Sequence, residues 1–249
     1  MAFNSDEHSV LRTGSQTQAG STDIGLRAYM LKVYNYMASG LTLTGIFAVI
    51  AANYAPLAQL LYVFDGKYVV GMTGLGWIVT LAPIGLVLLM SFGINKLSAS
   101  ATQGVFWFYS ALMGLSLSYI FFLYTGASIT RVFFITAGTF AGMSLYGYTT
   151  KRDLTGIGSF LIMGLIGLII ASVVNIFLAS PMLHWVISIA GVGIFVGLTA
   201  YDTQKIKLMY YEADGHEVAT KKAVMGALTL YLDFINLFIM LLRLFGERR

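Results

Sequence analysis

The stretch from Ala223 to Phe245, AVMGALTLYLDFINLFIMLLRLF, is apolar over almost its whole length and carries one acid, Asp233, in its middle third. A helix of roughly 20 apolar residues crosses the hydrocarbon core of a bilayer. Asp233 lies too far from either end of such a helix to reach water easily, and a charge at that depth is costly. We therefore expect its carboxyl group to face a partner group or a water-filled cavity. Asn236 follows three residues later and shares the same helical face.

A second acid, Asp202, ends the preceding apolar run within the stretch GLTAYDTQKIK at residues 197–207. One interpretation makes Asp202 an interfacial residue that Lys205 and Lys207 balance. The other makes it a functional residue, because acids at this depth usually face a bundle interior. If the helix continues past Asp202, its carboxyl group lies below the interface and can approach Asp233.

Two neighbouring carboxyl groups in a low dielectric cannot both stay ionised cheaply, so Asp202 and Asp233 would share a proton and titrate as a coupled pair. Such a pair senses pH, and we assign both residues a proton-sensing role. When both are ionised, they offer hard oxygen ligands for calcium, with Asn236 as a supplement. Asp202, Asp233 and Asn236 are therefore the predicted calcium site.

Composition places these two helices in a larger membrane domain. Of 249 residues, 57% are hydrophobic and only 10% are charged, which is typical of a polytopic membrane protein. We predict an all-α fold with seven transmembrane helices. We also predict a disordered polar cytosolic tail at 1–26 and a single transmembrane domain at 27–249. The seven apolar runs cover about 33–53, 75–94, 101–123, 129–149, 154–178, 183–201 and 223–245.

The same composition excludes several function classes. The net charge is +4, but the basic residues are scattered over loops and termini, so the lipid bilayer is the expected partner and nucleic acid is not. There is no cysteine for a thiolate site or nucleophile, no phosphate-binding loop, and no lysine in the last apolar run for a retinal Schiff base. We expect neither an enzyme nor a cofactor, with calcium as the bound or permeant ion.

Basic residues near the ends of the runs predict a cytoplasmic N-terminus, because cytoplasmic loops are enriched in Lys and Arg. Arg243, Arg248 and Arg249 would then lie on the opposite side, against that rule. Either the last helix spans the membrane despite its basic end, or it re-enters and returns the C-terminus to the cytoplasm.

The stretches Gly197-Leu-Thr-Ala-Tyr-Asp202-Thr-Gln-Lys-Ile and Tyr231-Leu-Asp233-Phe-Ile-Asn236-Leu-Phe resemble the two signature motifs of the Bax inhibitor-1 family, in its bacterial branch. The resemblance implies a seven-helix fold whose C-terminal helix is central and is wrapped by the other six in two groups of three. It also implies a pH-sensitive calcium leak in a bacterial inner membrane, in which protonation of the pair Asp202 and Asp233 gates the pore. For eukaryotic relatives it implies protection against cell death.

Two alternatives use the same residues. A secondary exchanger would swap protons for calcium, and would move calcium against its gradient when a proton gradient is supplied. A membrane scaffold or regulator would bind other membrane proteins in stress or cell death without a flux of its own, and its aspartates would serve only helix packing.

Overall fold

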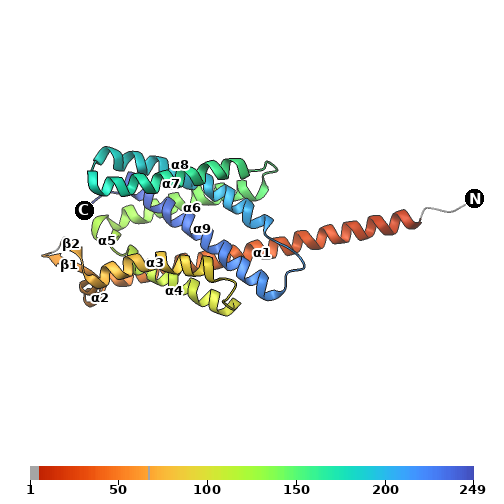
Figure 1. The fold of residues 1–249 in the computed structure, drawn as a ribbon, viewed down its shortest axis with the longest axis horizontal. Coiled ribbons are helices and arrows are strands. Elements are labelled where there is room, and N and C mark those ends of the chain that lie inside the picture. Colours follow the sequence, from red (N-terminus) through yellow and green to blue (C-terminus); the bar gives the residue numbers. More distant parts are fainter. Residues whose placement is uncertain (1–5, 67) are drawn as a thin grey trace, which may run out of the picture.

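The computed structural model describes residues 6–66 and 68–249, with side chains from residue 24 onward. Seven helices in the described part are long and apolar enough to cross a membrane, as predicted. Two short helices and a two-stranded sheet accompany them (Figure 1). The elements in chain order are α1 (Asp6–Asn53), α2 (Ala55–Leu61), β1 (Tyr62–Asp65), β2 (Tyr68–Met72), α3 (Gly74–Gly93), α4 (Ala99–Leu117), α5 (Ile120–Leu123), α6 (Gly126–Thr149), α7 (Thr155–Leu178), α8 (Pro181–Leu208) and α9 (His216–Phe245).

The C-terminal helix α9 is the centre of the bundle. In its most apolar window 72% of the residues are buried, against 11% in α7, so α9 is surrounded by protein whereas α7 presents most of its surface to lipid. Helices α1, α3 and α4 pack together on one side of α9, and α6, α7 and α8 pack together on the other (Figure 1). The arrangement of six helices in two groups of three around the last helix is therefore confirmed.

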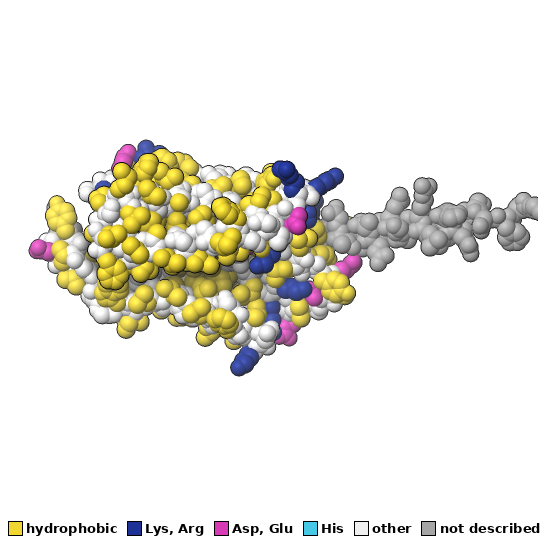
Figure 2. All heavy atoms as spheres, turned by 45° about the horizontal axis from the view of Figure 1, so that its top comes forward, with side chains coloured by type: hydrophobic (Ala, Val, Ile, Leu, Met, Phe, Trp, Pro, Cys, Tyr) yellow, Lys and Arg dark blue, Asp and Glu magenta, His cyan; other side chains and the backbone are white. Residues whose placement is uncertain are grey.

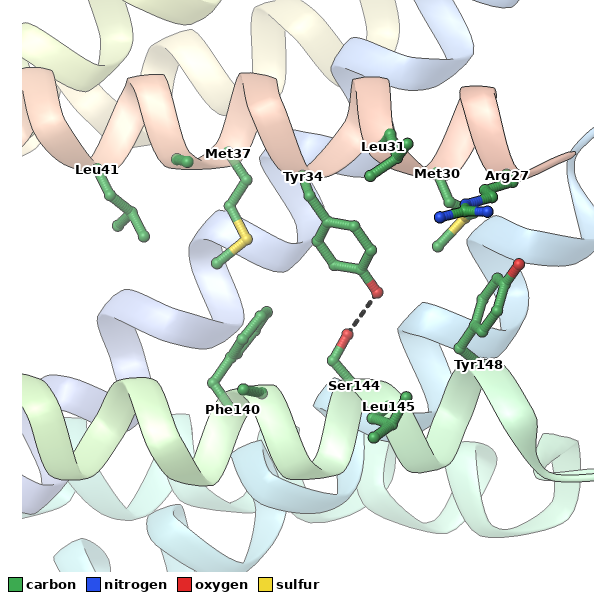
Figure 3. Close-up of a pocket in the computed structure, with 12 residues that line it drawn as sticks. Arg27, Met30, Leu31, Tyr34, Met37, Leu41, Phe140, Ser144, Leu145 and Tyr148 are labelled. Carbon is green, nitrogen blue, oxygen red and sulfur yellow. Dashed lines mark hydrogen bonds between the residues drawn. The ribbon is translucent and has the colours of Figure 1, made fainter. Parts of the chain in front are cut away.

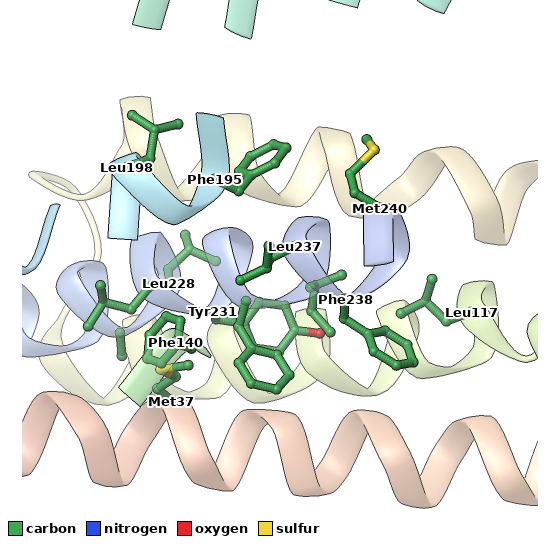
Figure 4. Packing of buried hydrophobic residues seen from close by; sticks show 14 of the residues in the cluster. Met37, Leu117, Phe140, Phe195, Leu198, Leu228, Tyr231, Leu237, Phe238 and Met240 are labelled. Atoms are coloured by element: carbon green, nitrogen blue, oxygen red, sulfur yellow. The ribbon is translucent and has the colours of Figure 1, made fainter. Parts of the chain in front are cut away.

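The core lies along α9, and Tyr231 is one of its fully buried aromatic residues (Figure 4). Its ring makes edge contacts with Tyr109 and Phe106 of α4, with centroids 5.4 and 6.1 Å away. Its hydroxyl group lies 2.7 Å from Thr44 Oγ1 of α1. A buried phenol needs such a partner, and here the hydrogen bond fixes the face of α9 that meets α1 and α4.

The connection from Tyr54 to Gly74 has secondary structure of its own. It forms α2 and an antiparallel hairpin whose strands pair Val63 with Gly71 and Asp65 with Tyr68. Gly66 has φ +60° at the turn, a conformation that glycine adopts without steric cost. The Asp-Gly dipeptide was the available signal for this hairpin.

The last helix spans the bundle instead of re-entering. It is continuous to Phe245, and the C-terminus lies at the opposite end of the bundle from the N-terminus (Figure 1). The final residues are fastened to the connection between α5 and α6: Arg249 N donates to Leu123 O at 3.0 Å, and Thr125 N donates to Glu247 O at 3.0 Å. Arg243, Arg248 and Arg249 therefore lie at this end.

Apolar side chains cover the flank of the bundle and charged side chains gather toward its ends (Figure 2). This distribution fits a chain that lies across a bilayer. The disorder predicted for the tail 1–26 stays a prediction: α1 begins at Asp6, whereas residues 1–5 and the side chains of 1–23 lie outside the described part of the chain.

Candidate functional site

The two predicted acids meet in the structure. The α8 helix continues past Asp202 to Leu208, which is the condition under which its carboxyl group was expected to approach Asp233. The carboxyl groups of Asp202 and Asp233 are in hydrogen-bonding contact. Asp233 is only 5% exposed, whereas Asp202 is partly buried. The pair therefore joins the last two helices of the bundle at a point shielded from water.

The surroundings of Asp233 leave one of its two carboxyl oxygens without a hydrogen-bond donor among the described residues. Its Oδ2 atom is fully buried and receives no hydrogen bond from any nitrogen or hydroxyl group of the described residues. A buried carboxylate without donors is strongly disfavoured. A proton shared with Asp202 removes this cost, because one carboxyl group then donates to the other.

The lysines around Asp202 contact tyrosine residues, and Lys205 also acts electrostatically on Asp202. Lys207 Nζ donates to the Tyr148 carbonyl at 2.8 Å and lies 5.1 Å from the centre of that ring. Lys205 Nζ lies 5.9 Å from the centre of the Tyr201 ring. Within the described part of the chain, neither lysine forms an ion pair with Asp202. The carboxyl group of Asp202 contacts that of Asp233 on the facing helix α9.

A cavity of about 500 Å³ between α7, α8 and α9 gives the pair access to a ligand. Most of its lining side chains are apolar, and the polar lining consists of Ser172, Asp202, Thr229, Asp233 and Asn236. Asn236 is thus on the same side as Asp233, as their spacing predicted. Its amide nitrogen donates to Leu232 O at 2.8 Å, which leaves the amide oxygen as an acceptor.

These groups could contribute carboxylate, amide and hydroxyl oxygens to a hard cation. No group of three or more His, Cys, Asp or Glu side chains with a metal-binding arrangement exists among the described residues. A calcium ion here would therefore have two carboxylates at most and would complete its coordination with neutral oxygens and water. Such a site suits passing ions better than tightly held ones, because affinity rises with the number of charged ligands.

Two glycines of neighbouring helices allow close packing against α8 near Asp202. A Cβ atom on Gly147 of α6 would lie 2.2 Å from the Ala200 carbonyl oxygen, and one on Gly158 of α7 would lie 2.3 Å from the Tyr201 ring. Only glycine permits such close approach of helices. The side chain of Gln204 adds a polar tie, since it accepts from Leu154 N at 2.9 Å and donates to Arg152 O at 2.8 Å.

A line of hydroxyl groups crosses the bundle beside the acid pair. Thr203 Oγ1 of α8 lies 3.0 Å from Ser144 Oγ of α6, which lies 2.6 Å from the Tyr34 hydroxyl of α1. The last contact bridges a groove of about 740 Å³ between α1 and α6 (Figure 3). The line of hydroxyl groups thereby connects the two groups of three helices. It begins at Thr203, the residue that follows Asp202 in the sequence.

Sequence reasoning missed Thr229 and this hydroxyl line. Thr229 lies four residues before Asp233, so its place on the same helical face was readable from the spacing. Tyr34, Ser144 and Thr203 belong to three different helices, and no sequence pattern indicates that their side chains meet.

Glu212, Asp214, His216 and Glu217 lie close together in the sequence, and two of these acids form ion pairs with lysines. Asp214 Oδ2 pairs with Lys222 Nζ at 2.5 Å, and Glu217 Oε1 pairs with Lys221 Nζ at 3.0 Å. The set lies at the connection from α8 to α9, on the end of the bundle where other charged side chains also gather (Figure 2).

The fold and the site together define a class of integral membrane proteins. In this class six helices surround a central last helix, and a pair of carboxyl groups lies at the contact of this helix with α8. Residues 26–249 match the family described as inhibitor of apoptosis-promoting Bax1, and the chain belongs to this family. It is 51% identical over 227 residues to the inner membrane protein YbhL of Escherichia coli K12, with 90% of this chain and 94% of YbhL covered.

Other relatives extend over the same region. An uncharacterised protein of Rickettsia prowazekii is 51% identical over 227 residues, covering 91% of this chain and 92% of the relative. An uncharacterised protein of Caulobacter vibrioides is 46% identical over 230 residues, covering 92% of each chain. The resemblance found in the two aspartate motifs therefore extends over nearly the whole transmembrane part.

Proposed function

We propose that this protein is a pH-sensitive, calcium-permeable leak channel whose gate is the pair Asp202 and Asp233. The observation that carries the proposal is the contact of these two carboxyl groups on the central helix and its neighbour, next to a cavity. Membership of the Bax inhibitor-1 family supports it. The protein acts as a passive conductor and not as an enzyme.

The gate works through the proton that the pair shares. While the pair holds one proton, a hydrogen bond ties α8 to α9. When that proton is lost, two carboxylates face each other in a low dielectric and repel each other. When a second proton binds, neither carboxyl group carries the negative charge that attracts calcium. Each change in proton number therefore alters the α8 to α9 contact, and with it the balance between closed and open states.

Calcium binds to the oxygen atoms of the same carboxyl groups. Ionised Asp202 and Asp233 attract a divalent cation into the cavity, and Asn236 and Thr229 offer neutral oxygens beside them. Because the coordination is incomplete without water, the ion leaves readily, which is what conduction requires.

We place the protein in a bacterial inner membrane, the location that the name of YbhL gives for that relative. The N-terminus and the connection from α8 to α9 face the cytoplasm. Support comes from Lys151, Arg152, Lys205 and Lys207 at this end of the bundle, in agreement with the enrichment of basic residues in cytoplasmic loops.

The test is calcium entry into liposomes that contain purified protein and a calcium-sensitive dye, at acidic and at alkaline pH. Wild type is compared with the double variant Asp202→Asn, Asp233→Asn, and Asp153→Asn is the control, because Asp153 is an exposed acid outside the bundle. Flux that depends on pH in wild type and control but not in the double variant supports the gate.

Two further outcomes separate the alternatives. Calcium that moves uphill when only a proton gradient is supplied identifies an exchanger in place of a channel. If folded wild type and double variant both carry no flux at either pH, the leak proposal is wrong and the protein is a scaffold or regulator of other membrane proteins.

A further inference from the structure

A second polar cavity lies at the other end of the bundle, far from the aspartate pair. It encloses about 410 Å³ between the turn from α7 to α8 and the end of α9. Arg243, Arg248 and His184 line it, and no acidic side chain does. Arg243 lies ten residues after Asp233, or about 15 Å along the helix. The cavity is therefore a separate site.

The cationic groups in this cavity lack a protein counterion. Arg243 is partly buried in the last turn of α9, yet neither Arg243 nor Arg248 has an ion-pair partner in the described part of the chain. Both guanidinium groups act electrostatically on His184, so the three groups share one neighbourhood. Gathering like charges in a partly desolvated place is unfavourable unless an anion joins them.

The neutral groups of the cavity also favour an anion. Asn175 Oδ1 accepts from Ser180 N at 3.0 Å, so its amide NH₂ remains as a donor. Helix α8 begins here at Pro181, and the positive end of its dipole adds to the field of the arginines. Donors and positive charge thus converge on the cavity from α7, α8 and α9.

The surrounding surface indicates where in the membrane the cavity lies. Phe177, Met182 and Trp185 beside it are 84%, 71% and 57% exposed, as expected of side chains that face lipid near the end of a span. Tryptophan is enriched at the level of the lipid headgroups. At that level, the abundant anions are phosphate groups, for which arginine supplies paired donors.

The geometry points to a binding site for a phosphate group, formed by Arg243, Arg248 and His184 at the C-terminal end of the bundle. The phosphate comes either from an anionic phospholipid of the adjoining leaflet or from the free ion. This site is independent of the proposed leak, and nothing in its test depends on calcium flux.

The test titrates purified, detergent-solubilised protein with phosphatidylglycerol and, separately, with inorganic phosphate. Native mass spectrometry counts retained lipid, and the thermal unfolding temperature reports binding of either ligand. The variants are Arg243→Gln and Arg248→Gln. Arg131→Gln is the matched control, because Arg131 lies at the same end but pairs with Glu247 at 3.0 Å outside the cavity.

We expect wild type and Arg131→Gln to bind equally, and each cavity variant to bind about tenfold more weakly, as the loss of a charged hydrogen bond predicts. Stabilisation by phosphatidylglycerol alone identifies a lipid site, and equal stabilisation by inorganic phosphate identifies a site for the free ion. Arg248 is exposed, so its variant folds even if Arg243→Gln does not. Binding of both ligands to folded Arg248→Gln with wild-type affinity would overturn the proposal.

Discussion

Asp202 of α8 and Asp233 of α9 form a hydrogen-bonded pair of carboxyl groups at the contact between the last two helices of the bundle. Asp233 is buried, and its carboxyl group contacts that of Asp202. Proton binding and the packing of α8 on α9 are therefore coupled in one contact. The first two predictions follow from this coupling.

Asp202→Asn should remove the pH dependence of calcium leak and change its basal rate. Asparagine keeps the size of the side chain and can donate to Asp233, but it cannot release or take up a proton in this range. Calcium entry into liposomes across a series of pH values measures the effect. A folded variant with the wild-type pH profile would exclude Asp202 from gating.

Asp233→Asn should lower calcium occupancy by removing one of the two carboxylate ligands. In wild type, occupancy should rise from acidic to alkaline pH, because calcium needs ionised carboxylates and competes with protons for them. Radioactive calcium binding to purified protein measures both effects. Unchanged binding in the folded variant would mean that the calcium site lies elsewhere.

The triple variant Glu212→Gln, Asp214→Asn, Glu217→Gln should leave calcium flux nearly intact. It removes the ion pair of Glu217 with Lys221 and the partly buried ion pair of Asp214 with Lys222, but it leaves the residues that line the cavity of the aspartate pair unchanged. Flux in liposomes measures the result. A strong loss of flux with the fold retained would assign this loop a role in permeation.

Gly147→Ala should destabilise the protein by about 1–3 kcal/mol, since the added Cβ would meet the backbone of Ala200 at 2.2 Å and push α8 away from α6. Gly142→Ala on the same helix is the control, because a Cβ there meets nothing within 4 Å. Thermal unfolding in detergent compares the two. Equal stability of both variants would show that α6 and α8 do not depend on this close approach.

Tyr231→Phe should destabilise the protein by about 1 kcal/mol, because it removes the buried hydrogen bond to Thr44 while the ring packing stays. Tyr211→Phe is the control, as Tyr211 is 65% exposed. The same unfolding measurement applies. A loss no larger than that of Tyr211→Phe would assign the attachment of α9 to apolar packing alone.

The sequence by itself determined the class of fold and the acids of the site. Seven apolar runs long enough to cross a bilayer predict seven spans, because backbone polar groups in hydrocarbon must be satisfied within a helix. Asp202 and Asp233 were recognisable because charged residues are rare at membrane depth, and Asn236 because of its spacing from Asp233.

Only the tertiary structure decided how these elements meet. Lys205 and Lys207 lie close to Asp202 in sequence, yet the lysines contact tyrosine rings and Asp202 contacts Asp233. Contacts between separate helices form the hydroxyl line of Tyr34, Ser144 and Thr203. Such contacts also bring Arg243 and His184 to one cavity. Helical periodicity specifies the face of a residue on its own helix, whereas packing of all seven helices selects which faces touch.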